Sequence, residues 1–374
     1  MNLRHLDALR GALAVYVLLG HCRWLLWAGH GAWLGSAPAA WEVPLAFGSG
    51  AFRYGREAVM VFFVLSGFFI HLRAAEALRA GLEAPPLPAG TFLARRAHRL
   101  VAPYGFALLV TVLCDLAGRT WFPILYAAQT GDALLDQLFA RGGYVANSVV
   151  PALMLLPSSL GRDFGSNGAL WSLAYEVVYY LLYPAWLAVR RRSAVLAFGA
   201  VPVACLALAL LPEVPFPSLV LIHYPIWLAG ALLAERVTGV QASFKAVSLA
   251  AGVFVAAGLW YLGSRALLGS ILATVVFGAA AVTACALAPS ADRPSLVMRA
   301  FEYLGIRSYT LYIVHLPLVS ILGAWAIQSW GGRPLHGWLA VAGALLAIGF
   351  SCLSFEICER HFLHQRLRIG QRRS

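Results

Sequence analysis

Two ionisable side chains, Arg10 and His21, lie inside the first long apolar stretch, which reads LDALRGALAVYVLLGHC from residue 6 to residue 22. Their spacing is close to three turns of a helix, so both project from one face with about 16 Å between them along the axis. Asp7 lies one turn before Arg10 and shares this face. An imidazole can take a proton from a hydroxyl and pass it on, as acyl transfer to an alcohol requires. His21 is therefore a candidate catalytic base; a histidine bonded to a neighbouring helix, with an interfacial arginine, is the structural alternative.

A carboxylate, Glu176, lies in another apolar stretch, LWSLAYEVVYYLLYP, from residue 170 to residue 184. In a membrane helix it would lie close to the depth of His21, where it could orient or charge-balance the imidazole. Trp171 is one of several aromatic residues around it, and an interfacial aromatic belt accounts for them as well as a binding site does. The belt does not account for Glu176, which we assign to the catalytic group.

Ser66 and Gly67 stand together in the apolar segment FFVLSGFF, from residue 62 to residue 69. A pair of small residues favours close packing of helices, and a hydroxyl nucleophile at Ser66 is the functional alternative. Arg96 and Arg99 share one face of the segment FLARRAHRLVAPY. Two guanidinium groups so placed can clamp phosphates, although basic residues at a membrane surface also act as a topology signal.

The segment YLGIRSYTLYIVHLP places Ser308, Tyr312 and His315 on one helix face, with a bend expected at Pro317. A structural hydrogen bond and a role in binding the acyl donor account equally well for His315.

The elements that must position these residues are membrane helices. Of the 374 residues, 61% are hydrophobic and 12% are charged, whereas soluble domains contain about 25% charged residues. Ten apolar segments have about the length that crosses a bilayer. They are residues 6–27, 58–72, 100–116, 170–189, 195–211, 219–234, 247–262, 267–288, 308–327 and 338–358. We predict an all-α, polytopic membrane bundle of about ten transmembrane helices. The run 144–156 is too short for a span and suits a re-entrant or interfacial segment.

The formal charge of +12 comes from basic residues between apolar segments, which argues against a nucleic-acid-binding face. If the N- and C-termini are cytoplasmic, most of these basic residues lie on the cytoplasmic side of the membrane, as the positive-inside rule expects. The six cysteines show no spacing typical of disulfides or of a metal site, and we predict no metal. We expect a single transmembrane domain over residues 1–374, with a short basic cytoplasmic tail at 359–374 and no appended soluble domain.

Five segments, taken in order, resemble the membrane-bound acyltransferase family 3, bacterial integral-membrane enzymes that O-acylate glycans and related acceptors. They are LDALRG with the following His21, FFVLSGF, RRAHRLVAP, LWSLAYE and LGIRSYTLYIVHLP. The resemblance implies a ten-helix domain in the bacterial cytoplasmic (inner) membrane that uses acetyl-CoA or another acyl-CoA from the cytoplasm. It also implies that His21 is the catalytic centre, that Arg10 is its partner, and that Arg96 and Arg99 contact the donor.

The resulting hypothesis is an O-acyltransferase that moves an acyl group, most simply acetyl, to a hydroxyl of a sugar-containing acceptor such as an envelope or exported polysaccharide. His21 either deprotonates this hydroxyl or carries the acyl group transiently, and Glu176 sets its orientation. The residues expected to bind donor or substrate are Asp7, Ser66, Arg96, Arg99, Trp171, Tyr312 and His315. Expected partners are membrane lipids, acyl-CoA and a glycan or glycolipid acceptor, with no nucleic acid and no tightly bound cofactor.

Two other functions fit the apolar composition. In a proton-coupled transporter or flippase, Asp7, His21 and Glu176 would relay protons; such a protein is expected to contain inverted repeats, and the sequence shows no internal symmetry. In a non-catalytic assembly partner of envelope synthesis, His21 would be dispensable.

Overall fold

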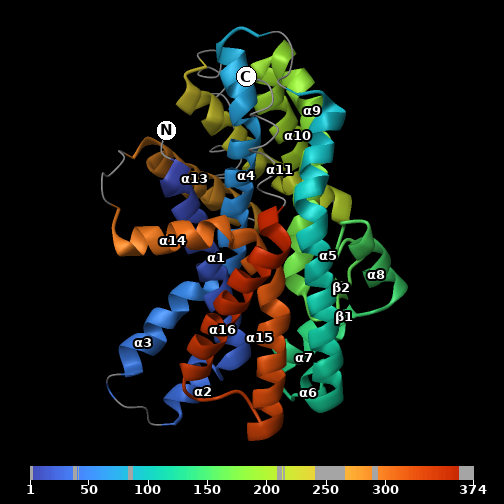
Figure 1. The fold of residues 1–374 in the computed structure, drawn as a ribbon, viewed down its shortest axis with the longest axis vertical. Coiled ribbons are helices and arrows are strands. Elements are labelled where there is room, and N and C mark those ends of the chain that lie inside the picture. The colour runs from blue at the N-terminus through green and yellow to red at the C-terminus, as the bar shows by residue number, and fades with distance from the viewer. Residues whose placement is uncertain are drawn as a thin grey trace. The chain divides into compact units, whose positions relative to one another are not determined.

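The structure is a computed structural model, and it describes residues 3–36, 40, 42–82, 87–208, 213, 215–240, 266–288 and 294–361. The described residues are mostly helical (Figure 1). The α-helices are α1 (Leu3–Leu26), α2 (His30–Leu34), α3 (Glu42–Ser49), α4 (Gly55–Arg79), α5 (Ala89–Trp121), α6 (Pro123–Tyr126), α7 (Ala133–Arg141), α8 (Ala146–Leu153), α9 (Trp171–Arg192), α10 (Val201–Ala207), α11 (Phe216–Thr238), α13 (Ala266–Leu287), α14 (Leu296–Ile306), α15 (Ser308–Trp330) and α16 (Trp338–Ser354).

Shorter elements join these helices. Two 3-10 turns, η1 (Gly50–Arg53) and η2 (Gly168–Leu170), precede α4 and α9, and two π-helical turns, η3 (Leu196–Ala200) and η5 (Phe355–Glu359), precede α10 and follow α16. Strands β1 (Gly142–Gly143) and β2 (Asp163–Phe164) pair in parallel.

Among the described residues, six helices are long and apolar enough to cross a membrane: α1, α4, α5, α11, α15, and α16 with η5. They coincide with six of the ten predicted spans. Helices also form at 171–192 and 266–287, whereas the predicted span 195–211 is divided between η3 and α10. The predicted span 247–262 and the basic tail from residue 362 lie outside the described residues. Ten spans and cytoplasmic termini therefore remain predictions.

The run 144–156 forms α8, a helix of only 8 residues. At 1.5 Å per residue it is about 12 Å long, far less than the roughly 30 Å of a hydrocarbon core. The prediction that this run is not a span is confirmed.

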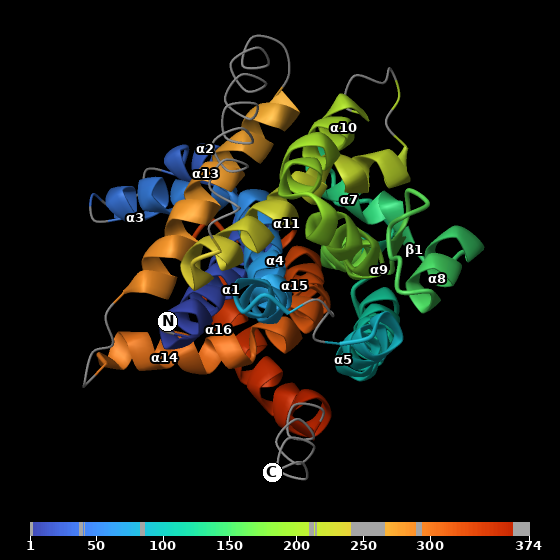
Figure 2. The ribbon, with the colours of Figure 1, turned by 90° about the horizontal axis from the view of Figure 1, so that it is seen from above.

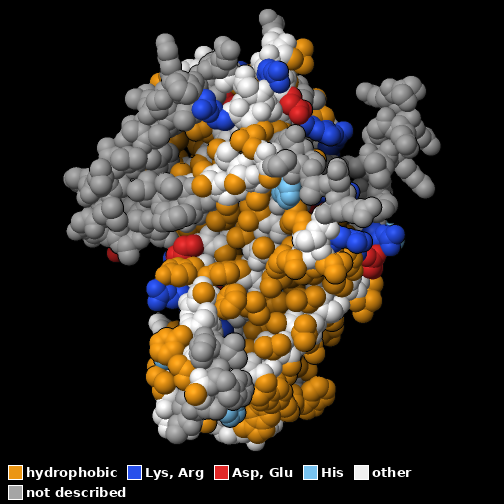
Figure 3. Space-filling view, turned by 90° about the vertical axis from the view of Figure 1, so that its left-hand side faces the viewer, with side chains coloured by type: hydrophobic (Ala, Val, Ile, Leu, Met, Phe, Trp, Pro, Cys, Tyr) orange, Lys and Arg blue, Asp and Glu red, His pale blue; other side chains and the backbone are white. Residues whose placement is uncertain are grey.

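Large apolar side chains face outward along the long helices. Leu109, Leu113 and Leu116 of α5 and Leu345 and Leu353 of α16 are each more than half exposed. Figure 3 shows hydrophobic side chains over a broad area of the described surface. Such a surface is stable against lipid chains rather than against water, as expected of a membrane protein.

The chain divides into two compact units. The first contains Met1–Leu13, Arg56–Ala94 and Tyr175–Glu302, and the second contains Ala14–Gly55, Arg95–Ala174 and Tyr303–Ser374. The chain passes between the units several times, so each unit contains segments that are far apart in sequence. The predicted single domain over residues 1–374 stays a prediction.

In the first unit, α4 and α11 lie side by side and meet at two glycines (Figure 2). A Cβ atom at Gly67 would lie 1.9 Å from the carbonyl oxygen of Trp227, and one at Gly230 would lie 1.9 Å from the carbonyl oxygen of Val64. Each glycine therefore admits the backbone of the other helix, which is how small residues promote helix association in membranes. The interpretation of Ser66 and Gly67 as a close-packing pair is confirmed at Gly67.

Replacing Gly67 with alanine should lower the stability of the purified protein by about 1–3 kcal/mol, because the new methyl group must push the two backbones apart. The measurement is the midpoint of thermal unfolding in detergent. Gly105→Ala is the matched control, since Gly105 also lies within a membrane helix but has no atom within 4 Å of the added Cβ. Equal midpoints for the two variants would contradict the close crossing.

In the second unit, the end of α1 is attached to the connection between α15 and α16. Trp27 Nε1 donates to the carbonyl oxygen of Leu335 at 2.7 Å, and Arg333 Nη1 donates to that of Trp24 at 2.6 Å. Arg333 also pairs with Asp132, just before α7. The Arg333 bond satisfies a backbone acceptor in the last turn of α1, and the Trp27 bond holds the residue that follows this helix.

Candidate active site

His21 on α1 and His315 on α15 form a direct pair in the second unit. His21 Nδ1 lies 2.7 Å from His315 Nε2; the ring centroids are 5.0 Å apart and the ring planes are inclined by only 18°, so the two rings meet edge to edge. His315 is buried and His21 is partly buried. The other ring nitrogen of His315, Nδ1, lies 3.1 Å from the carbonyl oxygen of Leu311 and 2.8 Å from that of Tyr312. Of the two alternatives for His315, the structural hydrogen bond is present, and its partner is the predicted catalytic residue.

Beside this pair, Pro317 leaves a backbone carbonyl oxygen of α15 without its helical hydrogen-bond donor. Pro317 has no backbone N–H, so the carbonyl oxygen of Ile313 has no helical donor. Asn167 Nδ2 takes that place at 2.9 Å and also donates to Thr111 Oγ1 at 3.0 Å. The buried Asn167 thereby fixes the segment before α9 to α15, two residues before His315. The sequence reasoning missed Asn167: Pro317 shows that a donor is needed, but not which residue provides it.

Tyr312 makes two further hydrogen bonds between α15 and the segment at the start of α9. Its hydroxyl donates to the carbonyl oxygen of Ala169 at 2.8 Å and accepts from Ser172 Oγ at 2.9 Å. Trp171 stands between these two anchored residues in the chain. The structure therefore brings the segment that carries Trp171 together with Tyr312 and His315, as a binding role requires.

Arg96 and Arg99 lie on α5 and are both partly buried. Tyr309 of α15 donates to the carbonyl oxygen of Leu100 at 3.4 Å, so α15 contacts α5 directly beside Arg99. His315 follows Tyr309 by six residues, or about 9 Å along the helix. The second unit thus contains the histidine pair, on α1 and α15, and the two arginines, on the part of α5 that contacts another turn of α15.

Asp7 and Arg10 form an ion pair in the first unit, with Arg10 Nη1 3.3 Å from Asp7 Oδ1. This confirms their predicted placement one turn apart. Helix α1 is unbroken from Leu3 to Leu26, so its geometry keeps Arg10 about 16 Å from His21 along the axis. The two residues share a helix, but their side chains do not touch.

Ser66 and Glu176 come together in the first unit. Ser66 Oγ donates to Glu176 Oε1 at 3.1 Å and accepts from Trp227 Nε1 at 3.3 Å, and the Tyr180 hydroxyl donates to the same carboxylate oxygen. These bonds give Ser66 a carboxylate as its neighbour. The orientation of His21 by Glu176 remains a prediction.

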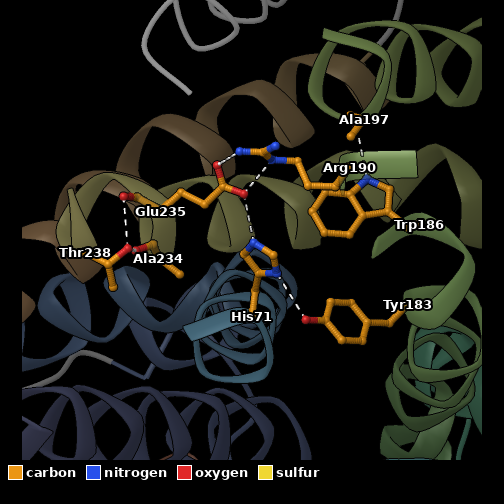
Figure 4. A network of polar contacts seen from close by, with 8 residues as sticks. All are labelled: His71, Tyr183, Trp186, Arg190, Ala197, Ala234, Glu235 and Thr238. Atoms are coloured by element: carbon orange, nitrogen blue, oxygen red, sulfur yellow. Dashed lines mark hydrogen bonds and ion pairs between the residues drawn. The ribbon is translucent and has the colours of Figure 1, made fainter. Parts of the chain in front are cut away.

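A second polar network of the first unit connects α4, α9 and α11 (Figure 4). Arg190 donates two hydrogen bonds of 2.7 Å to Glu235, from Nε to Oε1 and from Nη2 to Oε2. His71 Nε2 lies 2.9 Å from Glu235 Oε1, and the Tyr183 hydroxyl lies 3.1 Å from His71 Nδ1. His71 and Glu235 are both 0% exposed.

The sequence reasoning missed this network, although two signals for it exist. His71 stands inside an apolar run, where a charged or polar side chain is costly unless it has a partner. Glu235 directly follows the predicted span 219–234 and reads as a residue of the loop. Arg190 directly follows the predicted span 170–189, where the positive-inside rule already explains a basic residue, so its type and position do not indicate a buried carboxylate.

The fold and the paired histidines define a membrane protein with a polar centre among apolar helices. A family model described as an acyltransferase domain matches residues 3–355. The chain belongs to this family, which confirms the resemblance to acyltransferase family 3, and the protein is an enzyme that transfers acyl groups. No curated protein and no solved structure matches the chain.

Proposed function

We propose that this protein is a bacterial inner-membrane O-acyltransferase that moves an acyl group, most simply acetyl, from cytoplasmic acyl-CoA to a hydroxyl of a sugar-containing acceptor. The acceptor is an envelope or exported polysaccharide, or a glycolipid precursor of one. The observation that supports this proposal best is the 2.7 Å bond between His21 and His315, because it gives a base in a membrane helix a defined partner. Membership of the acyltransferase family supports the type of reaction.

In the proposed reaction, His21 removes the proton of the acceptor hydroxyl as its oxygen attacks the thioester carbonyl carbon. The new C–O bond forms, the C–S bond breaks, and the proton passes from His21 to the departing sulfur. The products are the O-acyl ester and free CoA, and no further reactant is needed. Transient acylation of His21 divides the same exchange into two steps.

The remaining site residues are assigned to binding and orientation. Arg96 and Arg99 hold the phosphates of CoA through charge-assisted hydrogen bonds, for which the guanidinium group is well suited. Arg10 and Glu176 complete the proposed catalytic group. Asp7 and Ser66, which bond to Arg10 and Glu176 respectively, are assigned to substrate binding, as are Trp171 and Tyr312.

The direct test is to incubate the purified protein in detergent or in vesicles with isotope-labelled acetyl-CoA and a panel of candidate glycans. Mass spectrometry of the glycans should find a labelled ester, together with a stoichiometric amount of free CoA. Movement of a glycan across the vesicle membrane without loss of acetyl-CoA would instead favour the transporter. Free CoA without any ester would mean that the acceptor is of another class.

Replacing Arg96 or Arg99 with alanine should raise the KM for acetyl-CoA by about ten-fold or more, since a hydrogen bond to a charged group contributes about 1.5–3 kcal/mol. The kcat should change little, because these contacts are the same in substrate and transition state. Arg162→Ala is the control, as Arg162 is an exposed arginine in a loop. A second donor, acetyl-dephospho-CoA, lacks the 3′-phosphate. The variant that has lost the contact to this phosphate should show the same KM for acetyl-CoA and for acetyl-dephospho-CoA. A fall in kcat at unchanged KM would contradict the assignment.

A further inference from the structure

Both partners of His315 Nδ1 are carbonyl oxygens, those of Leu311 and Tyr312. A carbonyl oxygen only accepts hydrogen bonds, so Nδ1 of His315 must carry a hydrogen. A neutral imidazole has one N–H, which leaves Nε2 of His315 with a lone pair. Because this hydrogen is fixed by the backbone of α15 itself, it does not depend on the rotation of another side chain.

The lone pair of His315 Nε2 points at His21 Nδ1, 2.7 Å away. Two lone pairs at that distance repel, so His21 Nδ1 must be the donor and must carry the single hydrogen of its own neutral ring. Nε2 of His21 is then a free lone pair. We infer that His315 is a positioning residue, which holds His21 in the tautomer whose Nε2 accepts the proton of the acceptor hydroxyl. This inference rests on the proposed function, in which His21 is the base.

The bond also favours the charged state that forms during the reaction. When Nε2 of His21 takes the proton, its ring becomes an imidazolium, and the Nδ1–H bond to neutral His315 becomes charge-assisted and stronger. An interaction that strengthens toward the transition state raises kcat rather than substrate affinity. The same tautomer is needed if the acyl group is carried on His21, because Nε2 would then be the nucleophile.

The fold holds His315 firmly enough for this role. Its side chain is 1% exposed, and its ring plane is inclined by only 18° to that of His21. The Asn167 bond to the carbonyl oxygen of Ile313 fixes α15 where Pro317 provides no backbone donor, close to the histidine. The last turn of α1 is held separately by Arg333. Both helices of the pair are therefore anchored within a few residues of the bond.

The test compares two replacements of His315 that differ in one property. In His315→Gln the amide oxygen lies near the former Nε2 and can accept from His21 Nδ1–H, whereas His315→Leu has similar bulk and no acceptor. We expect kcat of His315→Leu to fall by about 10²- to 10⁴-fold, the range for a general base that has lost its orienting partner. The KM for acetyl-CoA should be unchanged, and His315→Gln should recover at least a tenth of the wild-type kcat. Equal kcat values for the two variants, or a KM effect alone, would overturn the inference.

A spectroscopic readout tests the tautomer without reference to activity. In protein labelled with ¹⁵N-histidine, the His21 signals are identified by their loss in His21→Ala. Wild-type His21 should show a protonated Nδ1 and a non-protonated Nε2, and His315→Leu should shift this ring toward the opposite tautomer. A proton on Nε2 in the wild type would overturn the inference even if His315→Leu fails to fold. Activity in His21→Ala would instead refute the proposed function, while an inactive His21→Ala with a fully active His315→Leu would refute the role of His315 alone.

Discussion

The acyl-transfer rate of the purified protein should fall by at least about 10²- to 10⁴-fold when His21 is replaced by alanine, which is the usual contribution of a general base. The loss should be in kcat, with acetyl-CoA binding retained, because the arginines assigned to the donor are untouched. A methyl group can neither take the proton of the acceptor hydroxyl nor carry an acyl group, so both versions of the mechanism predict this result. The measurement is single-turnover transfer of labelled acetyl to the acceptor found in the direct assay.

A second buried histidine provides the control for His21→Ala. His223 lies in the membrane helix α11, is 0% exposed, and bonds through Nδ1 to the carbonyl oxygen of Leu219 in its own helix. His223→Ala removes the same side chain from a similarly apolar setting outside the proposed site, and it should retain the wild-type rate. Full activity of a folded His21→Ala would exclude the proposed mechanism. Equal losses in both variants would show that His21→Ala acts through packing.

Contacts within one helix could be predicted from the sequence, because helix geometry alone determines them. Asp7 and Arg10 are one turn apart and form the expected ion pair. The small residue Gly67 also indicated a close helix approach, although the sequence did not show that α11 is the partner helix. The lengths of the apolar runs also located the six membrane-length helices, since the thickness of the bilayer sets that length.

Contacts between helices could not be predicted in this way. His21 and His315 are 294 residues apart in sequence, and their contact depends on the rotation of two helices whose apolar residues are spread around the helix. In water, a hydrophobic stripe would show which face of each helix is buried, but lipid removes that distinction. Asn167 illustrates the same difficulty. It donates to the carbonyl oxygen of Ile313, which lacks a helical donor only because Pro317 stands four residues later in α15. Arg190 and Glu235 are 45 residues apart in sequence, so their pairing too depends on how α9 packs against α11.

Removing one partner of the buried pair of Arg190 and Glu235 should cause the largest loss of stability that we predict. Replacing Glu235 with alanine leaves the guanidinium without its counter-charge and His71 without an acceptor for its N–H. Removing one partner of a buried ion pair typically costs about 3–5 kcal/mol. We therefore expect a strongly lowered midpoint of thermal unfolding in detergent for Glu235→Ala.

Two further variants separate the loss of the ion pair from the loss of a side chain. Glu356→Ala is the matched control: Glu356 likewise accepts two bonds from arginine, from Arg307 at 2.7 Å and from Arg360 at 2.6 Å, but its side chain is 38% exposed. Water can replace those partners, so its effect should be much smaller. The double variant Arg190→Met with Glu235→Leu removes both charges and should be more stable than Glu235→Ala, because no buried charge is left unpaired. If the double variant were the less stable of the two, the energetic penalty would lie in packing among α4, α9 and α11, and the electrostatic explanation would be wrong.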